Sequence, residues 1–161
     1  MALEIEHKFL LKNQTWRQSV EKTVDFKQGY LVSDQTRSVR IRVSDHLAWL
    51  NIKSATIGNH RHEYEYPIPL EDGLEILQNL CGATVIEKKR HYVTFESHVW
   101  EIDEFLGANA GLIVAEIELK ALDETFARPD WLGDEVTDDI KYYNNQLAGN
   151  PYCNWIKTES T

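Results

Sequence analysis

Charged residues recur at every second position in many segments of this 161-residue chain, and neighbouring charges tend to share a sign. Grouped lysine and arginine side chains can hold a polyanion, because their nitrogens form strong charge-assisted hydrogen bonds with phosphate oxygens. Grouped carboxylates supply the hard oxygen ligands that Mg²⁺ or Mn²⁺ prefers. The charged alternate positions are Glu4, Glu6, Lys8, Arg40, Arg42, Lys53, Glu63, Glu65, Lys88, Arg90, Glu101, Asp103, Glu116, Glu118 and Lys120.

The spacing of these charges indicates strands with one apolar and one ionic face, since side chains at i, i+2 and i+4 lie on the same side of a strand. An antiparallel sheet with one solvated face is the ordinary interpretation. Three features favour another: threonine, serine and glutamine are scarce at these positions, the charges group by strand, and Arg-x-Arg and Glu-x-Glu pairs recur. The alternative is a closed sheet whose ionic faces turn inward and whose apolar faces are covered by helices.

The elements that must position these side chains are mainly strands. Helical spacing predicts a helix over Glu71–Leu80, which ends near Gly82, and a second over Asp138–Ala148 with Thr137 as its N-cap. Weaker helical signals cover Thr15–Lys22 and Asp123–Ala127. Period-2 alternation predicts strands over Leu3–Leu11, Ser38–Val43, Ala48–Lys53, His62–Pro67, Val85–Glu96, Val99–Phe105 and Leu112–Lys120. The pattern predicts an α+β, mainly β fold, either an antiparallel sheet or a barrel.

Composition bounds the class of protein. The length predicts one domain over residues 1–161, and no apolar run approaches the roughly 20 residues of a membrane helix. The acidic N-terminus lacks the basic and apolar regions of a signal peptide, and Cys81 and Cys153 do not suffice for a disulfide framework, so a cytoplasmic location is expected. The net charge of −9 disfavours nonspecific binding to nucleic acid or to anionic membranes.

Several ordered motifs resemble one known family. Glu4-Ile5-Glu6-His7-Lys8 is similar to the ExExK signature of the CYTH superfamily, whose members are also called triphosphate tunnel metalloenzymes. The likeness spans residue 3 to about residue 148 and is strongest with the short, single-domain bacterial inorganic triphosphatases. It continues through Gln28-Gly29-Tyr30-Leu31, Arg40-Ile41-Arg42, Lys53, Arg61-His62-Glu63-Tyr64-Glu65, Lys88-Lys89-Arg90, Asp103, Glu116-Ile117-Glu118, residues 131–137 and residues 139–144.

The resemblance implies an eight-stranded antiparallel β-barrel, a tunnel with a charged lumen, covering helices and a C-terminal plug-like helix. Lys8, Arg40, Arg42, Lys53, Lys88 and Arg90 would then bind the triphosphate. Glu4, Glu6, Asp103, Glu116 and Glu118 would hold the metal, Mg²⁺ or Mn²⁺ and as two ions, with Glu63 and Glu65 as supporting acids. The alternative is that these carboxylates serve only as salt-bridge partners of the bases.

Two further assignments concern catalysis and closure of the tunnel. One metal ion would offset charge on the leaving pyrophosphate, and the other would position a water for in-line attack. Glu4, Glu6 or Tyr30 would accept the proton, although Tyr30 can equally be a packed strand aromatic. On the last helix Lys141, together with Tyr142 and Asn145, would point at the tunnel as a plug, or the helix would simply dock on the surface.

Metal-dependent hydrolysis of inorganic triphosphate to pyrophosphate and phosphate is the leading hypothesis. A class IV-type adenylyl cyclase and a thiamine or nucleoside triphosphatase are the enzymatic alternatives; Trp49 could stack an organic group at the mouth or be a rim or core aromatic. A triphosphate- or polyphosphate-binding module is the alternative outside enzymes, and the number of carboxylates among the bases argues against it. The expected partner is a small polyanion, with the chain a monomer or a homodimer.

Overall fold

The computed structural model describes residues 2–55, 57, 60–82 and 85–159. Within these ranges nine strands form one antiparallel sheet. The strands are β1 (Ala2–Leu11), β2 (Lys22–Ser33), β3 (Arg37–Val43), β4 (Ala48–Ser54), β5 (His60–Ile68), β6 (Ile86–Phe95), β7 (His98–Phe105), β8 (Ile113–Leu119) and β9 (Leu132–Glu135). All seven predicted strands are present, and most begin and end within one residue of the predicted positions.

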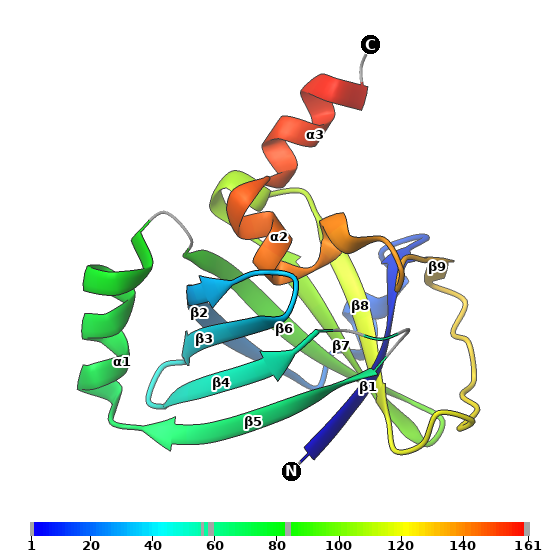
Figure 1. Ribbon diagram of the computed structural model, residues 1–161. Coiled ribbons are helices and arrows are strands. Elements are labelled where there is room, and N and C mark those ends of the chain that lie inside the picture. Colours follow the sequence, from blue (N-terminus) through cyan, green and yellow to red (C-terminus); the bar gives the residue numbers. More distant parts are fainter. Residues whose placement is uncertain (1, 56, 58–59, 83–84, 160–161) are drawn as a thin grey trace.

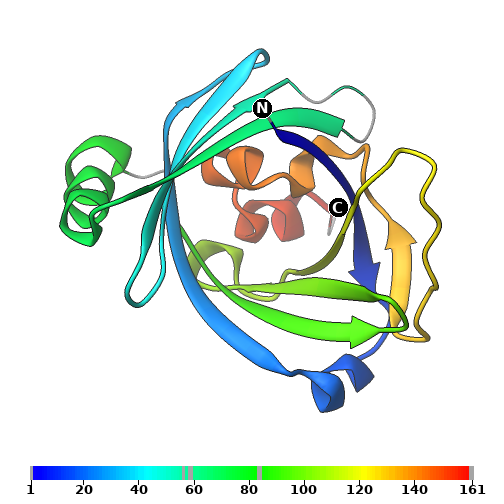
Figure 2. The same ribbon diagram turned by 90° about the horizontal axis from the view of Figure 1, so that it is seen from below.

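The sheet closes on itself. In the described part of the chain, the strand order is β5-β4-β3-β2-β6-β7-β8-β1-β9, and an additional pairing of β5 with β1 completes a ring of eight strands (Figure 2). The closing contact joins residues 2–5 of β1 to residues 60–63 of β5, while β9 pairs with the other end of the same edge of β1. The predicted eight-stranded antiparallel barrel is therefore confirmed. The charged alternate positions of its strands face inward, whereas Lys120 follows the end of β8 and is exposed.

The apolar outer faces of the strands are covered in two places. The 3-10 helix η1 (Thr15–Ser19) brings Trp16, which is fully buried, onto the strands β1, β6, β7 and β8, and Trp131 and Phe126 pack on the same cluster. On another side, α1 (Leu70–Ile76) continues into the π-helical turn η2 (Leu77–Cys81) and covers β2, β3 and β4 (Figure 1). These covers give the barrel wall an apolar core on its outside.

The cover made by α1 and η2 approaches β2 very closely at Gly29. A Cβ atom on this glycine would lie 2.7 Å from Cβ of Cys81 and 2.9 Å from its Sγ. Side-chain carbon atoms do not approach each other so closely, so the position requires glycine for steric reasons. The close packing fixes the helix against the strand that carries Gln28 and Tyr30 on its inner side.

The C-terminal segment closes one end of the barrel. It contains η5 (Ile140–Tyr142), α2 (Asn144–Gly149) and α3 (Tyr152–Glu159). The short η4 (Gly107–Asn109), which connects β7 to β8, contacts it through Asn109, whose Oδ1 accepts from the backbone N–H of Tyr152. Seen through the ring, these helices lie across its far end (Figure 2). Among the described residues no helix is long and apolar enough to cross a membrane.

Three predictions about helices were wrong. Thr15–Lys22 forms only the short η1, because Lys22 already begins β2, a strand that the alternation did not reveal. Asp123–Ala127 is a turn and irregular chain. Residues 138–148 form two short helices with an extended residue, Tyr143 (φ −73°, ψ 139°), between them.

Thr137 does not cap the predicted helix. Its hydroxyl accepts a hydrogen bond from the backbone N–H of Lys8 and donates one to Glu135, so it links β1 to β9. Asp139 caps η5 instead, its carboxylate accepting from the N–H of Lys141.

Candidate functional site

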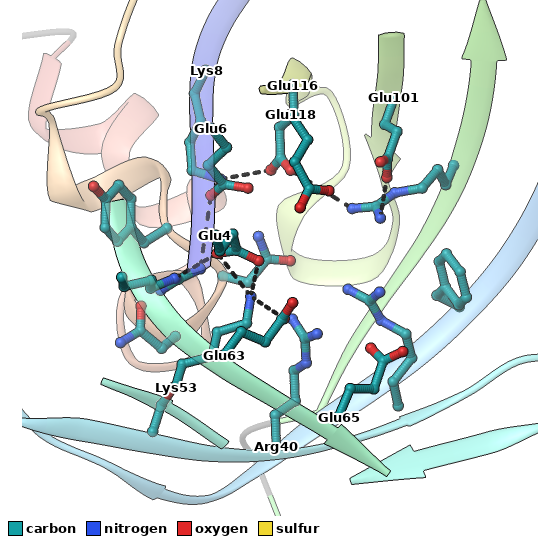
Figure 3. A pocket seen from close by; sticks show the side chains of 18 of the residues that line it. Glu4, Glu6, Lys8, Arg40, Lys53, Glu63, Glu65, Glu101, Glu116 and Glu118 are labelled. Atoms are coloured by element: carbon teal, nitrogen blue, oxygen red, sulfur yellow. Dashed lines mark hydrogen bonds and ion pairs between the residues drawn. The ribbon is translucent and has the colours of Figure 1, made fainter. Parts of the chain in front are cut away.

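The barrel encloses a cavity of about 320 Å³ that is lined almost entirely by polar side chains from all eight strands of the ring (Figure 3). Of the residues singled out from the sequence, it is lined by Glu4, Glu6, Lys8, Tyr30, Arg40, Arg42, Lys53, Glu63, Glu65, Lys88, Arg90, Glu116 and Glu118. Asp103 and Lys141 are not among the lining residues. The ionic faces are thus interior surfaces, and the alternative of a solvated ionic face is wrong.

Asp103 lies behind the cavity wall and holds two of its cations. Its Oδ1 accepts from Nε of Arg90 at 2.8 Å, and its Oδ2 accepts from a terminal nitrogen of Arg90 at 2.9 Å and from Nζ of Lys88 at 2.7 Å. Burial alone would raise the pKa of Asp103, but Arg90 and Lys88 outweigh it and lower that pKa to about 2. Because both oxygens are occupied in a fully buried position, the geometry favours a role in orienting these cations over the predicted role as a metal ligand.

The basic side of the lumen holds guanidinium groups without acidic partners. Within the described residues neither Arg40 nor Arg42 forms an ion pair, and Nε of Arg40 is buried without a hydrogen-bond partner. Arg42 donates from Nε to Oε1 of Gln28 at 3.0 Å and lies 4.6 Å from the ring centre of Phe26. Burial, reinforced by Arg40 and the nearby Arg90, lowers the pKa of Arg42 to about 9. Such a group of buried, mutually repelling cations favours binding of an anion.

Lys88 also experiences this excess of positive charge. Burial lowers its pKa, as do Arg90 and Arg42, and Asp103 offsets only part of the effect, so the pKa of Lys88 falls to about 7. The Nζ atom also donates to Oδ1 of Asn144 on α2 at 2.9 Å. A polyanion in the cavity would restore the charged form of this lysine.

The acidic side of the lumen contains carboxylates held by ion pairs. Glu4 accepts from Nε of Arg61 at 2.7 Å and lies 3.2 Å from Nζ of Lys53, and these cations outweigh burial and lower its pKa well below the usual range. Nζ of Lys8 lies 2.6 Å from Glu116 and 3.2 Å from Glu6. Figure 3 shows Glu4, Glu6, Glu116 and Glu118 gathered on one side of the cavity, facing Arg40 and Lys53.

Three carboxylates have the opposite electrostatic character. Burial, together with Glu4, Glu101 and Glu6, raises the pKa of Glu118 to about 7, and within the described residues its carboxylate forms no ion pair. Burial also raises the pKa values of Glu63 and Glu101, although Lys53 contacts the first and Arg90 the second. A divalent cation would relieve this accumulation of negative charge.

The donor set fits a hard divalent cation, since every candidate ligand is a carboxylate. In the part of the chain that the structure describes, no three acidic, histidine or cysteine side chains are grouped closely enough to hold a metal ion. Lys8, Lys53 and Arg61 instead hold Glu4, Glu6 and Glu116 in ion pairs. Metal binding would therefore require the carboxylates to exchange these partners.

The remaining predicted residues lie in different surroundings. Tyr30 is nearly buried, lines the cavity and also packs in the apolar cluster at the closed end. It is therefore both a cavity residue and a packed strand aromatic, the two alternatives predicted for it. Trp49 is half-buried and is not among the lining residues. The Nζ atom of Lys141 lies 4.8 Å from the ring centre of Trp155. Asn144 and Asn145 of α2 line the cavity, whereas Lys141 does not.

The sequence analysis assigned no role to several residues of the site, and four of them take part in the contacts described above. Arg61 and Glu101 share the parity of the predicted ligands, which was the signal available for them. Phe26 has no charge to reveal it, although it stacks on Arg42 and lies 5.5 Å from Arg90. Asn144 belongs to the C-terminal segment. The local sequence pattern of that segment does not indicate that it lies over the barrel.

Comparisons with known proteins agree with this geometry. A model of the CYTH domain family matches residues 2–146. The chain is 46% identical to an inorganic triphosphatase of Acetivibrio thermocellus over 155 residues, which cover 96% of this chain and 99% of that protein. It is 32% identical to an inorganic triphosphatase of Nitrosomonas europaea over 149 residues, covering 90% of this chain and 96% of that protein.

The fold has a counterpart among solved structures. The crystal structure of the inorganic triphosphatase NE1496 superposes with a TM-score of 0.65 and 30% sequence identity. The superposition covers 92% of this chain and 95% of that one. The similarity therefore extends over most of both chains.

Proposed function

The chain belongs to the CYTH domain family, and on this premise we propose that it is an inorganic triphosphatase that binds its substrate inside the barrel. The observation that carries the proposal is the division of the lumen. Within the described residues Arg40, Arg42 and Glu118 form no ion pair, and Arg40 faces the carboxylates that include Glu118 (Figure 3). One side suits phosphate oxygens and the other suits divalent cations, and hydrolysis of a phosphoanhydride requires both.

The six cations predicted from the sequence, which all line the lumen, would bind the three phosphates. Arg40, Arg42 and Arg90 can each offer two parallel N–H donors to phosphate oxygens, whereas lysines supply compact charge. Asp103 fixes the orientation of Arg90 and Lys88 before substrate arrives, which reduces the reorganisation that binding requires. Lys8 and Lys53, now paired with carboxylates, complete the set.

Glu4, Glu6, Glu116 and Glu118 would hold Mg²⁺ or Mn²⁺, as two ions, with Glu63 and Glu65 as supporting acids. The metal would supply charge neutralisation on the phosphates and a water of lowered pKa. Water adds to a terminal phosphorus, the bond to the bridging oxygen breaks, and phosphate and pyrophosphate leave. Glu4, Glu6 and Tyr30 are the candidates to accept the proton of that water, and all three line the cavity.

The test measures phosphate release from inorganic triphosphate, ATP and thiamine triphosphate in parallel, with Mg²⁺, with Mn²⁺ and with a chelator. We expect metal-dependent release that is fastest from inorganic triphosphate. Release that persists in the chelator would contradict the assigned role of the carboxylates. Formation of cyclic AMP from ATP, without phosphate release from triphosphate, would identify a cyclase.

We also propose a single domain over residues 1–161, a cytoplasmic location, and a monomer or a homodimer. These proposals rest on chain length and composition. Light scattering after size-exclusion chromatography distinguishes the two assembly states, because their masses differ twofold.

A further inference from the structure

The inner surface of the barrel changes from ionic to apolar along its length. Val114 lies four residues before Glu118 on β8 and shares its side of the strand, yet it is buried among hydrophobic residues. Phe105 lies two residues from Asp103 on β7, Ile86 lies two residues from Lys88 on β6, and each shares the side of the strand of that charged residue. The apolar end comprises Tyr30, Ile86, Phe105, Leu112, Val114, Leu147 and Trp155, with Tyr142, Ala148 and Tyr152 packed against them.

The C-terminal helices fill this end. Leu147 of α2 is 1% exposed, and Trp155 of α3 is 6% exposed. The Trp155 ring contacts Tyr142 edge-on at 5.2 Å between centroids, and its Nε1 donates to the carbonyl of Asn150 at 3.0 Å. Figure 2 shows these helices across the far end of the ring. The lumen is thus closed at this end by packed hydrophobic side chains.

The opposite end is open. Glu65 and Glu118, which lie there, are exposed, whereas Lys8 and Lys88 nearer the closed end are 4% and 1% exposed. The β1–β8 register orders the lumen from the closed end to the mouth, since Val114 pairs with Leu10 and Glu118 with Glu6. A linear anion can therefore enter by one mouth only, and its leading end must stop at the closed end.

Asn144 stands where the leading end would stop. Its Oδ1 accepts from Nζ of Lys88 at 2.9 Å and from Nε2 of Gln28 at 2.8 Å, and Gln28 accepts from Nε of Arg42 at 3.0 Å. These donors fix the amide so that its oxygen faces them. Within the described residues Nδ2 of Asn144 makes no hydrogen bond, although the side chain lines the cavity. Two N–H donors are therefore available beside two substrate cations.

We propose that the tunnel binds phosphate chains by one free end, with the terminal phosphate against the Asn144 amide, Lys88 and Arg42. The substrate class is then any linear phosphate chain with at least one unsubstituted end. Chains substituted at both ends are excluded because their organic groups cannot pass the apolar closure. This inference rests on the proposed function for turnover, but binding alone can test it.

The test compares inorganic triphosphate, ATP and diadenosine pentaphosphate, which have two, one and no free ends. Diadenosine pentaphosphate carries more phosphates than ATP, so weak binding of it cannot be ascribed to too little charge. We expect ATP to compete with triphosphate and diadenosine pentaphosphate to compete at least tenfold more weakly than ATP. Equal competition by the two nucleotides would overturn the proposal.

A second arm tests the Asn144 contact with an isosteric pair of variants. Asn144→Asp keeps the oxygen that Lys88 and Gln28 need, removes the two N–H donors and adds a negative charge at the closed end. Gln146→Glu makes the same change of charge at an exposed position on the same helix. We expect the dissociation constant of triphosphate to rise at least tenfold in N144D and less than twofold in Q146E, with N144D melting no lower than the parent protein. Equal affinities in the two variants would refute the Asn144 contact.

Melting temperatures separate this inference from the proposed function. If triphosphate is not hydrolysed but triphosphate and ATP raise the melting temperature and diadenosine pentaphosphate does not, end-on binding stands and the triphosphatase assignment fails. If triphosphate is hydrolysed and all three compounds raise the melting temperature equally, the assignment stands and end-on binding fails.

Discussion

Replacing Asp103 with asparagine should destabilise the protein more than the loss of any surface charge. The side chain is fully buried, and its carboxylate accepts three hydrogen bonds from Arg90 and Lys88. Asparagine has nearly the same shape, so the change removes the charge and one acceptor without opening a cavity. Breaking a buried ion pair by removing one partner costs about 3–5 kcal/mol, because the remaining charge is left buried without compensation.

This cost corresponds to a large shift in melting temperature. In a protein of 150–250 residues 1 kcal/mol changes the melting temperature by about 2–4 °C, so D103N should melt roughly 6–20 °C lower. The matched control is Asp25→Asn, which breaks the exposed 3.1 Å pair with Lys89, the residue between the two partners of Asp103. Exposed pairs contribute about 0–1 kcal/mol, so D25N should melt within a few degrees of the parent protein.

Differential scanning fluorimetry with and without triphosphate completes the test. A polyanion in the lumen would supply the negative charge that D103N lacks, so the ligand should raise the melting temperature of D103N by more than that of the parent protein. A D103N variant that melts with D25N would refute the reasoning, since Arg90 and Lys88 would then not need this counter-ion.

Three other predictions address the metal, the substrate and the fold. The pKa of Glu118 is raised to about 7, so this group contributes to the free energy of unfolding fully below its unfolded pKa, and the contribution is lost as the pH rises through 7. Glu118→Gln should flatten this part of the pH–stability curve and abolish metal-dependent turnover. An unchanged curve would contradict the raised pKa. Arg42→Lys should raise the KM for triphosphate about tenfold in steady-state assays, because lysine loses both the planar donors and the bond to Gln28; an unchanged KM would remove Arg42 from the binding set. Gly29→Ala should lower the free energy of unfolding measured in urea by about 1–3 kcal/mol, because the added Cβ would meet Cys81, while kcat per folded molecule stays unchanged. A stability equal to that of the parent protein would show that η2 can move to accommodate the Cβ atom.

Strands were predictable where both faces of the strand carry the pattern. β8 alternates the charged inner residues Glu116 and Glu118 with apolar outer ones, so its limits were predicted within one residue. β2 was missed because its inner residues are uncharged and some of its outer residues are charged. Its inner residues Phe26, Gln28 and Tyr30 are uncharged, while the charged Asp25 and Lys27 face outward.

The broken C-terminal segment could not be predicted from local spacing, because a distant contact decides it. Tyr143 keeps an extended backbone, and its hydroxyl donates to the carbonyl of Thr137 at 2.9 Å. Thr137 in turn is engaged by the N–H of Lys8 from β1. An N-cap signal in the sequence carries no information about such a competing partner 129 residues away.

The site was predictable as a set of charges but not as a set of pairs. Asp103 shares the parity of the candidate metal ligands, yet the β6–β7 register places it opposite Arg90, where it becomes a counter-ion. Glu118 pairs across strands with Glu6, another acid, and forms no ion pair with any cation in the described part of the chain. Which carboxylate serves a base and which is available to a metal therefore depends on register and closure, neither of which the alternation encodes.

The lumen contains enough opposite charge to fold without its ligands, and this links the two halves of the proposed chemistry. Lys8 and Lys53 are held by Glu116 and Glu4, so these cations reach a polyanion fully only when the carboxylates release them. A carboxylate released from its lysine is a stronger ligand for a divalent cation, because a positive charge beside it has gone. A bound cation likewise weakens the hold of the carboxylate on its lysine. Metal binding frees the lysines that triphosphate needs, and triphosphate binding frees the carboxylates that the metal needs. Each ligand should therefore raise the affinity of the protein for the other.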